Sequence, residues 1–255
     1  MITPYRIVIH GGIDGFSRLI VFLGASSNNR ASTVFGLFLD AVERYNIPSR
    51  VRSDYGMENI DVGRFMITNR GMNRGSFLTG SSVRNQRIER LWRETNRIIA
   101  SRFVNIFLYL EQQNIFYPDS ELHLMALHLV YLPIVNEALH AFVEEWNNHP
   151  VTSACNYTPR QLWVRGMLSS RNSNYSAVND VITDRQQLEN LGVDEDGPVP
   201  QHQSVNYVAV PEIEYGLTDE QERVVHEIRQ RFVTDTNGIL CYLEVLQYVS
   251  SILDV

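Results

Sequence analysis

Hydrophobic residues change their spacing along the first third of the chain, and the changes predict alternating strands and helices. Residues 6–13 and 19–24 are runs of aliphatic and β-branched residues separated by the turn-like sequence Asp-Gly-Phe-Ser, so they predict a hairpin. Residues 32–45 place apolar side chains at helical spacing and end just before Pro48. Weaker signals follow for a strand, a helix and a strand, at residues 50–53, 59–68 and 75–79. This order is typical of an α/β fold, in which helices flank a mixed sheet.

A long helix is predicted from residue 85 to about residue 109. One face gathers mostly apolar residues: Ile88, Leu91, Trp92, Thr95, Ile98 and Ile99. The opposite face gathers a row of arginines: Arg87, Arg90, Arg93 and Arg97. Such a row is often only a solvated face with ion pairs at helical spacing. Because Glu94 is the one acid within it, positive charge remains in excess, and a phosphate-bearing partner is favoured.

The second half of the chain predicts helices separated by polar segments. The helical patterns lie at residues 122–147, interrupted by Pro133, and at residues 159–167, 218–233 and 238–253. The sequence TDEQ at 218–221 is a capping box that begins one of them. Residues 169–179 and 194–203 are polar and rich in turn-forming residues, which predicts linkers. We therefore expect a core at residues 1–168, a partly flexible linker at 169–216 and an acidic helical appendage at 217–255.

The distribution of charge changes the expected partner. The whole chain has a formal net charge of −7, which by itself argues against nucleic acid. Residues 1–102, however, hold 15 Arg and 8 acidic residues, a net charge of +7. All 22 basic residues are Arg, whose guanidinium group forks onto a phosphate with two hydrogen bonds. The acidic remainder suits either an intramolecular cover for this basic part or a basic partner.

Several classes of protein are not expected from the sequence. Cys155 and Cys241 are isolated, so neither a disulfide framework nor a Cys/His zinc cluster is expected. No stretch approaches the roughly 18–20 uncharged apolar residues of a membrane span. The first ten residues lack the basic start and the cleavage site of a secretion signal. We therefore expect an intracellular protein without a membrane partner.

Three acidic residues lie in segments whose pattern suits metal-dependent chemistry: Asp14, Asp54 and Glu89. Asp54 follows a predicted strand, and Glu89 lies in the first turns of the long helix, between its apolar and basic faces. An acid at the end of a strand faces the crevice above an α/β sheet, and an acid early in a following helix reaches the same crevice. Carboxylates gathered there hold Mg²⁺ ions that serve phosphodiester chemistry. Two of these residues also have an ordinary alternative, a turn for Asp54 and a surface ion pair for Glu89.

Four motifs occur in order around these residues. Asp54-Tyr-Gly is followed, with 34 residues between the two acids, by the sequence NQRIER at 85–90, which contains Glu89. EEWNNHP at 144–150 and NYTPRQLWVRGM at 156–167 come next. Over roughly residues 5–168, this pattern resembles the integrase core of retroviruses, long-terminal-repeat retrotransposons and cut-and-paste transposons. The whole chain is similar to integrase-core-domain proteins encoded in animal genomes. Three residues depart from the family pattern: Tyr55, Met57 and Gln86.

The resemblance implies a ribonuclease-H-like mixed sheet flanked by helices, with the C-terminal helical appendage added to it. It implies that Asp54 and Glu89 are catalytic ligands of Mg²⁺ or Mn²⁺, and that Asn85 and the arginine row contact DNA. Integrase cores usually work as multimers, so a homo-oligomer is also implied. A role on DNA implies a nuclear location, although the sequence has no clear import signal.

Asp14 receives a different interpretation from the same resemblance. In the family, the first catalytic Asp lies on the first strand, and the second strand often ends in a segment like Val-Asp-x-Phe-Ser-Arg. IDGFSR at 13–18 matches that second-strand segment. Asp14 is therefore expected to mark the end of the second strand and not to be a catalytic residue. The first catalytic Asp is expected about 10–15 residues upstream, at or before Pro4, where the chain has no acid. Either two of three carboxylates remain and activity is impaired, or the active chain begins further upstream.

Three functions follow as expectations. The first is metal-dependent polynucleotidyl transfer, the chemistry of DNA integration. The second is a domesticated or decayed core that binds DNA or protein without catalysis. The third is a nuclease of the ribonuclease H type.

Overall fold

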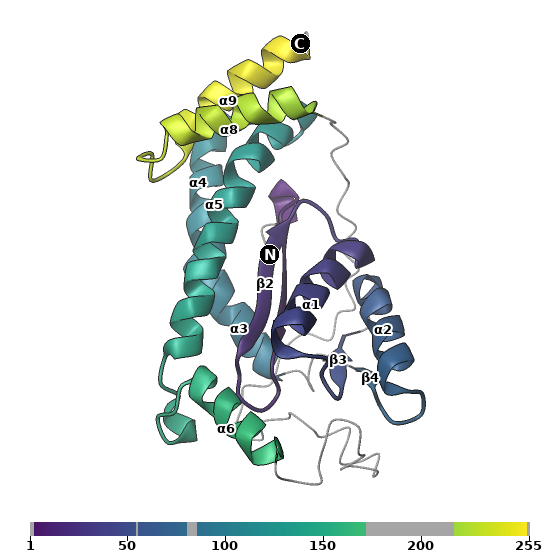
Figure 1. Cartoon of the computed structure of the whole chain (residues 1–255). Coiled ribbons are helices and arrows are strands. Elements are labelled where there is room, and N and C mark those ends of the chain that lie inside the picture. The colour runs from purple at the N-terminus through teal and green to yellow at the C-terminus, as the bar shows by residue number, and fades with distance from the viewer. Residues whose placement is uncertain (1–2, 55, 81–85, 172–216, 254–255) are drawn as a thin grey trace.

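The structure is a computed structural model that describes residues 3–54, 56–80, 86–171 and 217–253. A β-hairpin lies between the long helix α5 (Glu121–Asn148) on one side and α1 (Ala31–Tyr45) on the other (Figure 1). Helix α2 (Ile60–Arg70) and a short parallel pair of strands lie beyond α1. The C-terminal helices cross one end of α5. The hairpin is therefore covered by helices on two sides.

The hairpin consists of β1 (Val8–Ile13) and β2 (Ile20–Ser26), which pair antiparallel and confirm the predicted hairpin. Two amide side chains of α5 cover the edge of β2 that faces away from β1. Asn136 accepts from the Ala25 N–H at 2.8 Å and donates to the Ala25 carbonyl at 3.0 Å. Asn147 does the same for Ile20, at 2.9 and 3.1 Å. Each amide thus supplies the donor and the acceptor that a neighbouring strand would supply.

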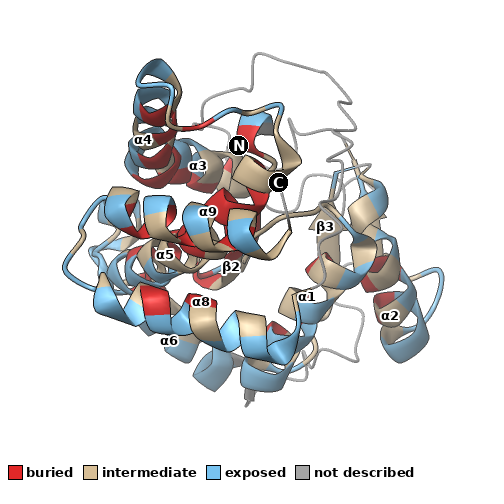
Figure 2. Cartoon of the chain, turned by 90° about the horizontal axis from the view of Figure 1, so that it is seen from above, coloured by how far each residue is buried: buried red, intermediate tan, exposed pale blue. Residues whose placement is uncertain are grey.

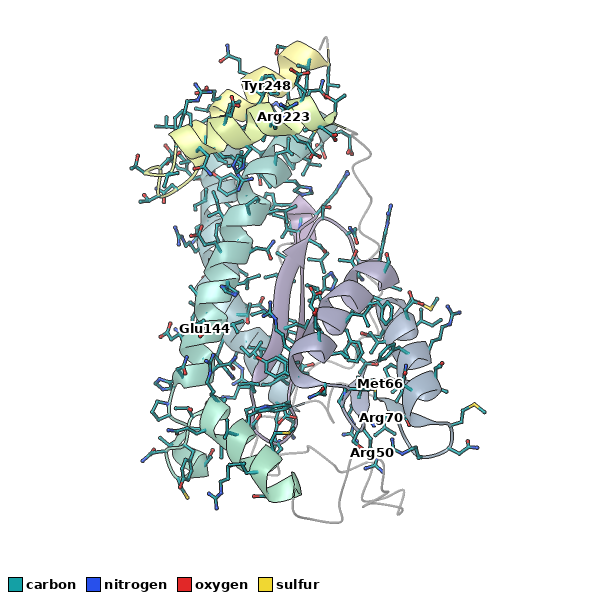
Figure 3. The ribbon with its side chains drawn as sticks, in the orientation of Figure 1. Arg50, Met66, Arg70, Glu144, Arg223 and Tyr248 are labelled. Atoms are coloured by element: carbon teal, nitrogen blue, oxygen red, sulfur yellow. The ribbon has the colours of Figure 1, made fainter. Side chains whose placement is uncertain are left out.

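The other strands are β3 (Val51–Ser53) and β4 (Phe77–Thr79), which pair in parallel. A 3₁₀ turn at Met57–Asn59 and helix α2 connect them. A small hydrophobic cluster joins this pair to α1, and its buried members are Val34, Phe38, Val62 and Met66. In Figure 3, Met66, Arg70 and Arg50 follow one another down the side of α2 and β3. The guanidinium group of Arg70 donates to the carbonyl groups of Ile47 and Pro48, which fixes the entry into β3.

The α/β class is confirmed, whereas the described strands form two separate pairs and not the single mixed sheet that was expected. A single sheet requires β1 and β3 to be joined, directly or through a strand that pairs with both. No backbone ladder connects the two pairs within the described residues. Strand propensity and alternation predict that strands exist, but they do not decide which edges meet.

The predicted long helix is present, and its geometry changes once along its length. It consists of α3 (Gln86–Thr95), a π-helical turn (Asn96–Ala100) and α4 (Ser101–Gln112). The expected apolar face is correct for Leu91, Thr95 and Ile99, which are all buried. It is wrong for Ile98, which is 43% exposed. The π turn widens the helix locally, so the regular 3.6-residue spacing used for the prediction does not hold there.

Helix α5 runs through Pro133 without a break, so the predicted interruption is wrong. Proline inside a helix costs about 3 kcal/mol in isolation. Here the helix packs against β2 and α9 with eleven of its 28 residues buried, and this packing outweighs the local cost. Helix α5 is also long and apolar enough, by length and composition, to cross a membrane. Half of that apolar window is buried inside the fold, which accounts for its composition.

Helix α6 (Pro159–Arg171) extends past the predicted helix end at residue 167. The two predicted linkers otherwise lie outside the described residues. The next described residue is Leu217, and Thr218 caps the start of α8 (Asp219–Arg231) with the predicted capping box. Its hydroxyl accepts from the Gln221 N–H at 3.3 Å, while the Gln221 side chain accepts from the Thr218 N–H at 2.8 Å. The capping prediction is therefore confirmed.

The main hydrophobic core lies around α5. Figure 2 shows buried residues concentrated where α4, α5 and α9 (Ile239–Ile252) face one another, and fewer in α1 and α2. From α9, the side chains of Tyr242, Val245 and Val249 are fully buried in this core. The Tyr242 hydroxyl also lies 2.8 Å from Nδ1 of His123 on α5. The C-terminal helices therefore share the core of the region that precedes them.

A buried histidine on α5 makes the stability depend on pH. Nε2 of His128 donates to the Tyr5 carbonyl at 2.8 Å. Burial lowers the pKa of His128, so the folded protein holds the neutral ring while the unfolded chain still takes up a proton. Stability is then fully present above about pH 6.5 and is lost as the pH falls below it, by at most about 1.4 kcal/mol per pH unit for this histidine. We expect His128→Gln to reduce the loss of unfolding free energy between pH 7.5 and 5.5, measured by urea denaturation.

The control for this prediction is His140→Gln, because His140 is exposed on the same helix. That variant is expected to keep the pH dependence of the unaltered protein. Burial also lowers the pKa of His10 and His123, so part of the dependence is expected to remain in His128→Gln. Equal pH profiles for His128→Gln and His140→Gln would contradict the prediction.

Candidate active site

Asp54 lies directly after the carboxyl end of β3, as the sequence predicted for the end of a strand. Its side chain is exposed, and Oδ1 accepts a hydrogen bond from Nδ2 of Asn59 at 3.1 Å. Asn59 is the last residue of the 3₁₀ turn that follows, so the chain folds back on itself within five residues. This turn holds the Asp54 carboxylate at the rim of the β3–β4 pair.

Glu89 lies in the first turn of α3 and is half-buried. Burial raises the pKa of the Glu89 carboxyl, and the nearby negative charge of Asp54 raises it further. Arg93, one turn along the helix, opposes both effects. Two carboxylates that are 34 residues apart in the sequence therefore lie close enough for one charge to act on the other.

Glu58 is a third carboxylate at this place, and sequence reasoning missed it. It is half-buried, and its Oε1 lies 3.4 Å from the same Asn59 amide nitrogen that donates to Asp54. Burial raises its pKa, a hydrogen bond from its own backbone lowers it, and the Asp54 charge raises it. The available signal was its position four residues after Asp54, because a tight turn brings residues at that spacing together.

Asp14 is engaged in the hairpin turn. Its Oδ2 accepts from the N–H groups of Phe16 and Ser17, at 3.1 and 2.6 Å, and from the Ser17 hydroxyl at 2.7 Å. The turn is closed further by the Asp14 N–H, which donates to the Leu19 carbonyl at 2.8 Å. These bonds are those of an aspartate that stabilises a turn. They account for the Asp-Gly-Phe-Ser sequence at the end of β1 as a turn.

The arginine row is mostly exposed along α3 and the π turn. Arg90, Arg93 and Arg97 are exposed, whereas Arg87 is half-buried. Arg97 forms an ion pair with Glu94 at 2.8 Å, three residues apart on the helix, which is one of the ion pairs at helical spacing considered in the sequence analysis. The remaining predicted DNA contact, Asn85, lies outside the described residues. The row therefore begins beside Glu89 and continues away from it along one helix.

The carboxylates suit a divalent cation by their chemistry. Oxygen ligands from Asp54 and Glu89 are those that Mg²⁺ and Mn²⁺ prefer. Burial and, secondly, repulsion by Asp54 raise the pKa of Glu89, and a cation between the two groups would relieve the repulsion. In the part of the chain that the structure describes, no three acidic, histidine or cysteine side chains converge at metal-binding distances. Among the described residues, Asp54 and Glu89 thus offer a cation a pair of oxygen ligands.

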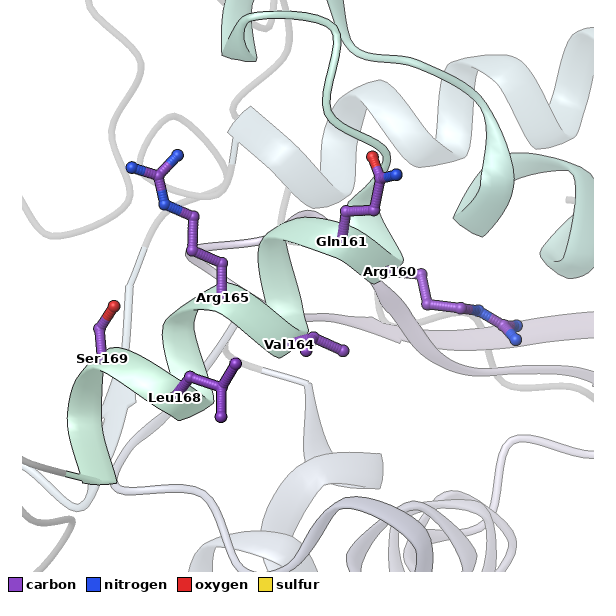
Figure 4. Close-up of a pocket in the computed structure, with 6 residues that line it drawn as sticks. All are labelled: Arg160, Gln161, Val164, Arg165, Leu168 and Ser169. Carbon is purple, nitrogen blue, oxygen red and sulfur yellow. The ribbon is translucent and has the colours of Figure 1, made fainter.

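An open hollow of about 390 Å³ lies along α6 (Figure 4). Its described lining is Arg160, Gln161, Val164, Arg165, Leu168 and Ser169. Arg160 pairs with Glu144 at 3.1 Å, and the Arg165 guanidinium lies 5.4 Å from the centre of the Tyr157 ring. Neither Asp54 nor Glu89 lines this hollow, so it is separate from the carboxylates.

Comparison with known families identifies the class of protein. The model of the integrase core domain family matches residues 1–177, which is well over half of the chain. The chain therefore belongs to the integrase core family, as the sequence motifs suggested. Members of this family act on DNA in integration and typically use divalent metal ions. No curated protein and no solved structure matches the chain.

Proposed function

We propose that the protein is a metal-dependent polynucleotidyl transferase of the integrase kind, in which Asp54 and Glu89 hold a Mg²⁺ or Mn²⁺ ion. The observation that supports this most directly is the proximity of the two carboxylates. They come from different elements, the end of β3 and the start of α3, and the charge of Asp54 adds to the effect of burial in raising the pKa of Glu89. Family membership supplies DNA as the substrate.

Asn59 and the neighbouring arginines have roles in this proposal. A bound divalent cation would supply the Lewis acid that activates a water or hydroxyl and stabilises the leaving oxygen. Asp54 would hold it in an orientation set by the hydrogen bond from Asn59. Arg93 favours the ionised form of Glu89, which is the form that binds a cation. Arg90 on α3 and Arg97 on the π turn are exposed and would contact the DNA backbone.

We expect the full chain to join or cleave DNA in the presence of Mn²⁺. Asp54→Asn and Glu89→Gln are each expected to reduce the rate by at least about 100-fold, because loss of a direct ligand should exceed the 10–100-fold cost of losing an outer-shell partner. The measurement is a gel assay of labelled oligonucleotides with and without Mn²⁺.

The control is Asp14→Asn, which keeps an oxygen acceptor in the hairpin turn and is expected to keep activity. Its folding is checked by circular dichroism, because Asp14 accepts three hydrogen bonds in that turn. Activity that is lost in Asp14→Asn but retained in Asp54→Asn would reject the assignment of the site.

A second function is favoured by a different observation. The turn already engages the Asp14 carboxylate, and no three ligand side chains converge within the described residues. A core of this kind would bind DNA through the arginine row without catalysis. DNA binding that weakens with salt and persists in both Asp54→Asn and Glu89→Gln, with no Mn²⁺-dependent product from any variant, would favour this second function.

A further inference from the structure

The hollow along α6 follows two rows of side chains at four-residue spacing. The described residues of its lining form these rows: Arg160, Val164 and Leu168 in one, and Gln161, Arg165 and Ser169 in the other (Figure 4). Rows of this kind are the ridges on the surface of a helix, and the groove between two of them receives a ridge of a second helix. The hollow, called the α6 groove below, therefore has the shape that another helix fits.

Helix α6 is fixed to the fold by its opposite side. The centre of the Trp163 ring lies 5.3 Å from that of Tyr45 on α1, and a Cβ atom added to Gly166 would lie 3.0 Å from the Phe16 ring. The groove side remains open, since Val164 is 51% exposed and Leu168 61% exposed. Large apolar side chains that lie exposed next to one another mark a surface for a protein partner.

The charge along the groove indicates the chemistry of that partner. Helix α6 contains three arginines and no acidic residue. Arg160 pairs with Glu144, but both side chains are more than half exposed, and such a pair contributes little and is readily exchanged. Arg165 stacks over the Tyr157 ring, which leaves the edge of its guanidinium group to a carboxylate. Each row thus offers one guanidinium group to a negative charge.

We propose that the α6 groove binds an acidic amphipathic helix of a protein partner. The apolar side chains of that helix pack on Val164 and Leu168, and its carboxylates pair with Arg160 and Arg165, as in other complexes that place a helix in a groove. A DNA backbone would use the two arginines but would leave the apolar side chains exposed, so a protein fits this surface better. The proposal goes beyond the metal site, because neither Asp54 nor Glu89 lines the groove.

Fluorescence anisotropy with the full chain tests the proposal. The probe is a labelled helical peptide of about 15 residues, with leucine along one face and glutamate on the others. We expect saturable binding of this glutamate peptide. A matched peptide with lysine in place of every glutamate is expected to bind at least about tenfold more weakly, because like charges across an interface suppress the wrong partner.

Variants of the groove locate the binding. Leu168→Ala and Arg165→Gln are each expected to weaken binding of the glutamate peptide at least about fivefold, the effect of truncating an interface anchor. The matched controls are Leu240→Ala, an exposed leucine on α9, and Arg64→Gln, an exposed arginine on α2. Both controls are expected to bind as the unaltered chain does. Circular dichroism verifies that every variant is folded.

Three outcomes would overturn the proposal: no saturable binding of the glutamate peptide, equal binding of the lysine peptide, or equal binding by Leu168→Ala and Arg165→Gln. If the same two variants weaken binding of a labelled DNA duplex while the peptide does not bind, the groove is a DNA contact and the proposal is wrong. Asp54→Asn is expected to bind the glutamate peptide normally, so a failure of the proposed function is distinguishable from a failure here.

Discussion

A chain that ends after residue 216 is expected to lose its cooperative unfolding transition. The cut removes α8 and α9, and with them the side chains of Tyr242, Val245 and Val249, which are fully buried against the rest of the core. Burial of three such side chains contributes roughly 5–9 kcal/mol, which is comparable with the roughly 5–15 kcal/mol stability of a whole domain. The cut also removes the Asn237 carbonyl that accepts from the buried Tyr131 hydroxyl at 2.9 Å.

Urea denaturation followed by circular dichroism measures this effect, with point variants on α9 as matched controls. Tyr242→Ala removes a fully buried ring and is expected to cost about 3–5 kcal/mol. Leu240→Ala changes a residue that is 59% exposed on the same helix and is expected to cost less than about 0.5 kcal/mol. A shortened chain that unfolds cooperatively at the midpoint of the full chain would show instead that α8 and α9 are a separable appendage.

The second large effect is expected from Asn147→Ala. The Asn147 side chain is almost fully buried and pairs with both the N–H and the carbonyl of Ile20. Its removal leaves two buried backbone groups on β2 without partners, and each costs about 1–3 kcal/mol. We expect the unfolding free energy to fall by about 2–4 kcal/mol, measured by urea denaturation at pH 7.5.

The neighbouring residue provides the control for Asn147. Asn148 is exposed, and its amide donates to the Glu144 carbonyl of its own helix at 2.8 Å. Asn148→Ala is therefore expected to change stability by less than about 0.5 kcal/mol. Equal losses in the two variants would mean that α5 does not hold the edge of β2 through this amide.

Local patterns predicted the elements of this fold better than their assembly. The β-branched runs before and after Asp14 predicted the hairpin, and TDEQ predicted the start of α8, because both signals depend only on neighbouring residues. Pro133 was predicted to interrupt a helix by the same local reasoning, and there the packing of α5 against β2 and α9 prevails. The π turn at Asn96–Ala100 leaves no trace in a 3.6-residue periodicity, so the exposure of Ile98 was not foreseen.

The candidate site was predictable in part for a similar reason. Asp54 at a strand end and Glu89 in the first turn of a helix have recognisable surroundings in the sequence. Glu58 has none, because its place depends on the path of a three-residue turn. Asn136 and Asn147 were also missed, since an amide on a helix has the same hydrophobic pattern whether it faces water or a strand.

The two amides on α5 make the two edges of the hairpin unequal, because they bond backbone groups at the β2 edge. Open strand edges are where β-proteins recruit further strands, from their own chain or from another molecule, and where they aggregate. Asn136 and Asn147 bond the backbone groups of Ala25 and Ile20, so a further strand cannot pair with these residues at the outer edge of β2. Any enlargement of this sheet, including one that joins two copies of the chain, is therefore confined to the β1 side, which leaves a single direction for growth.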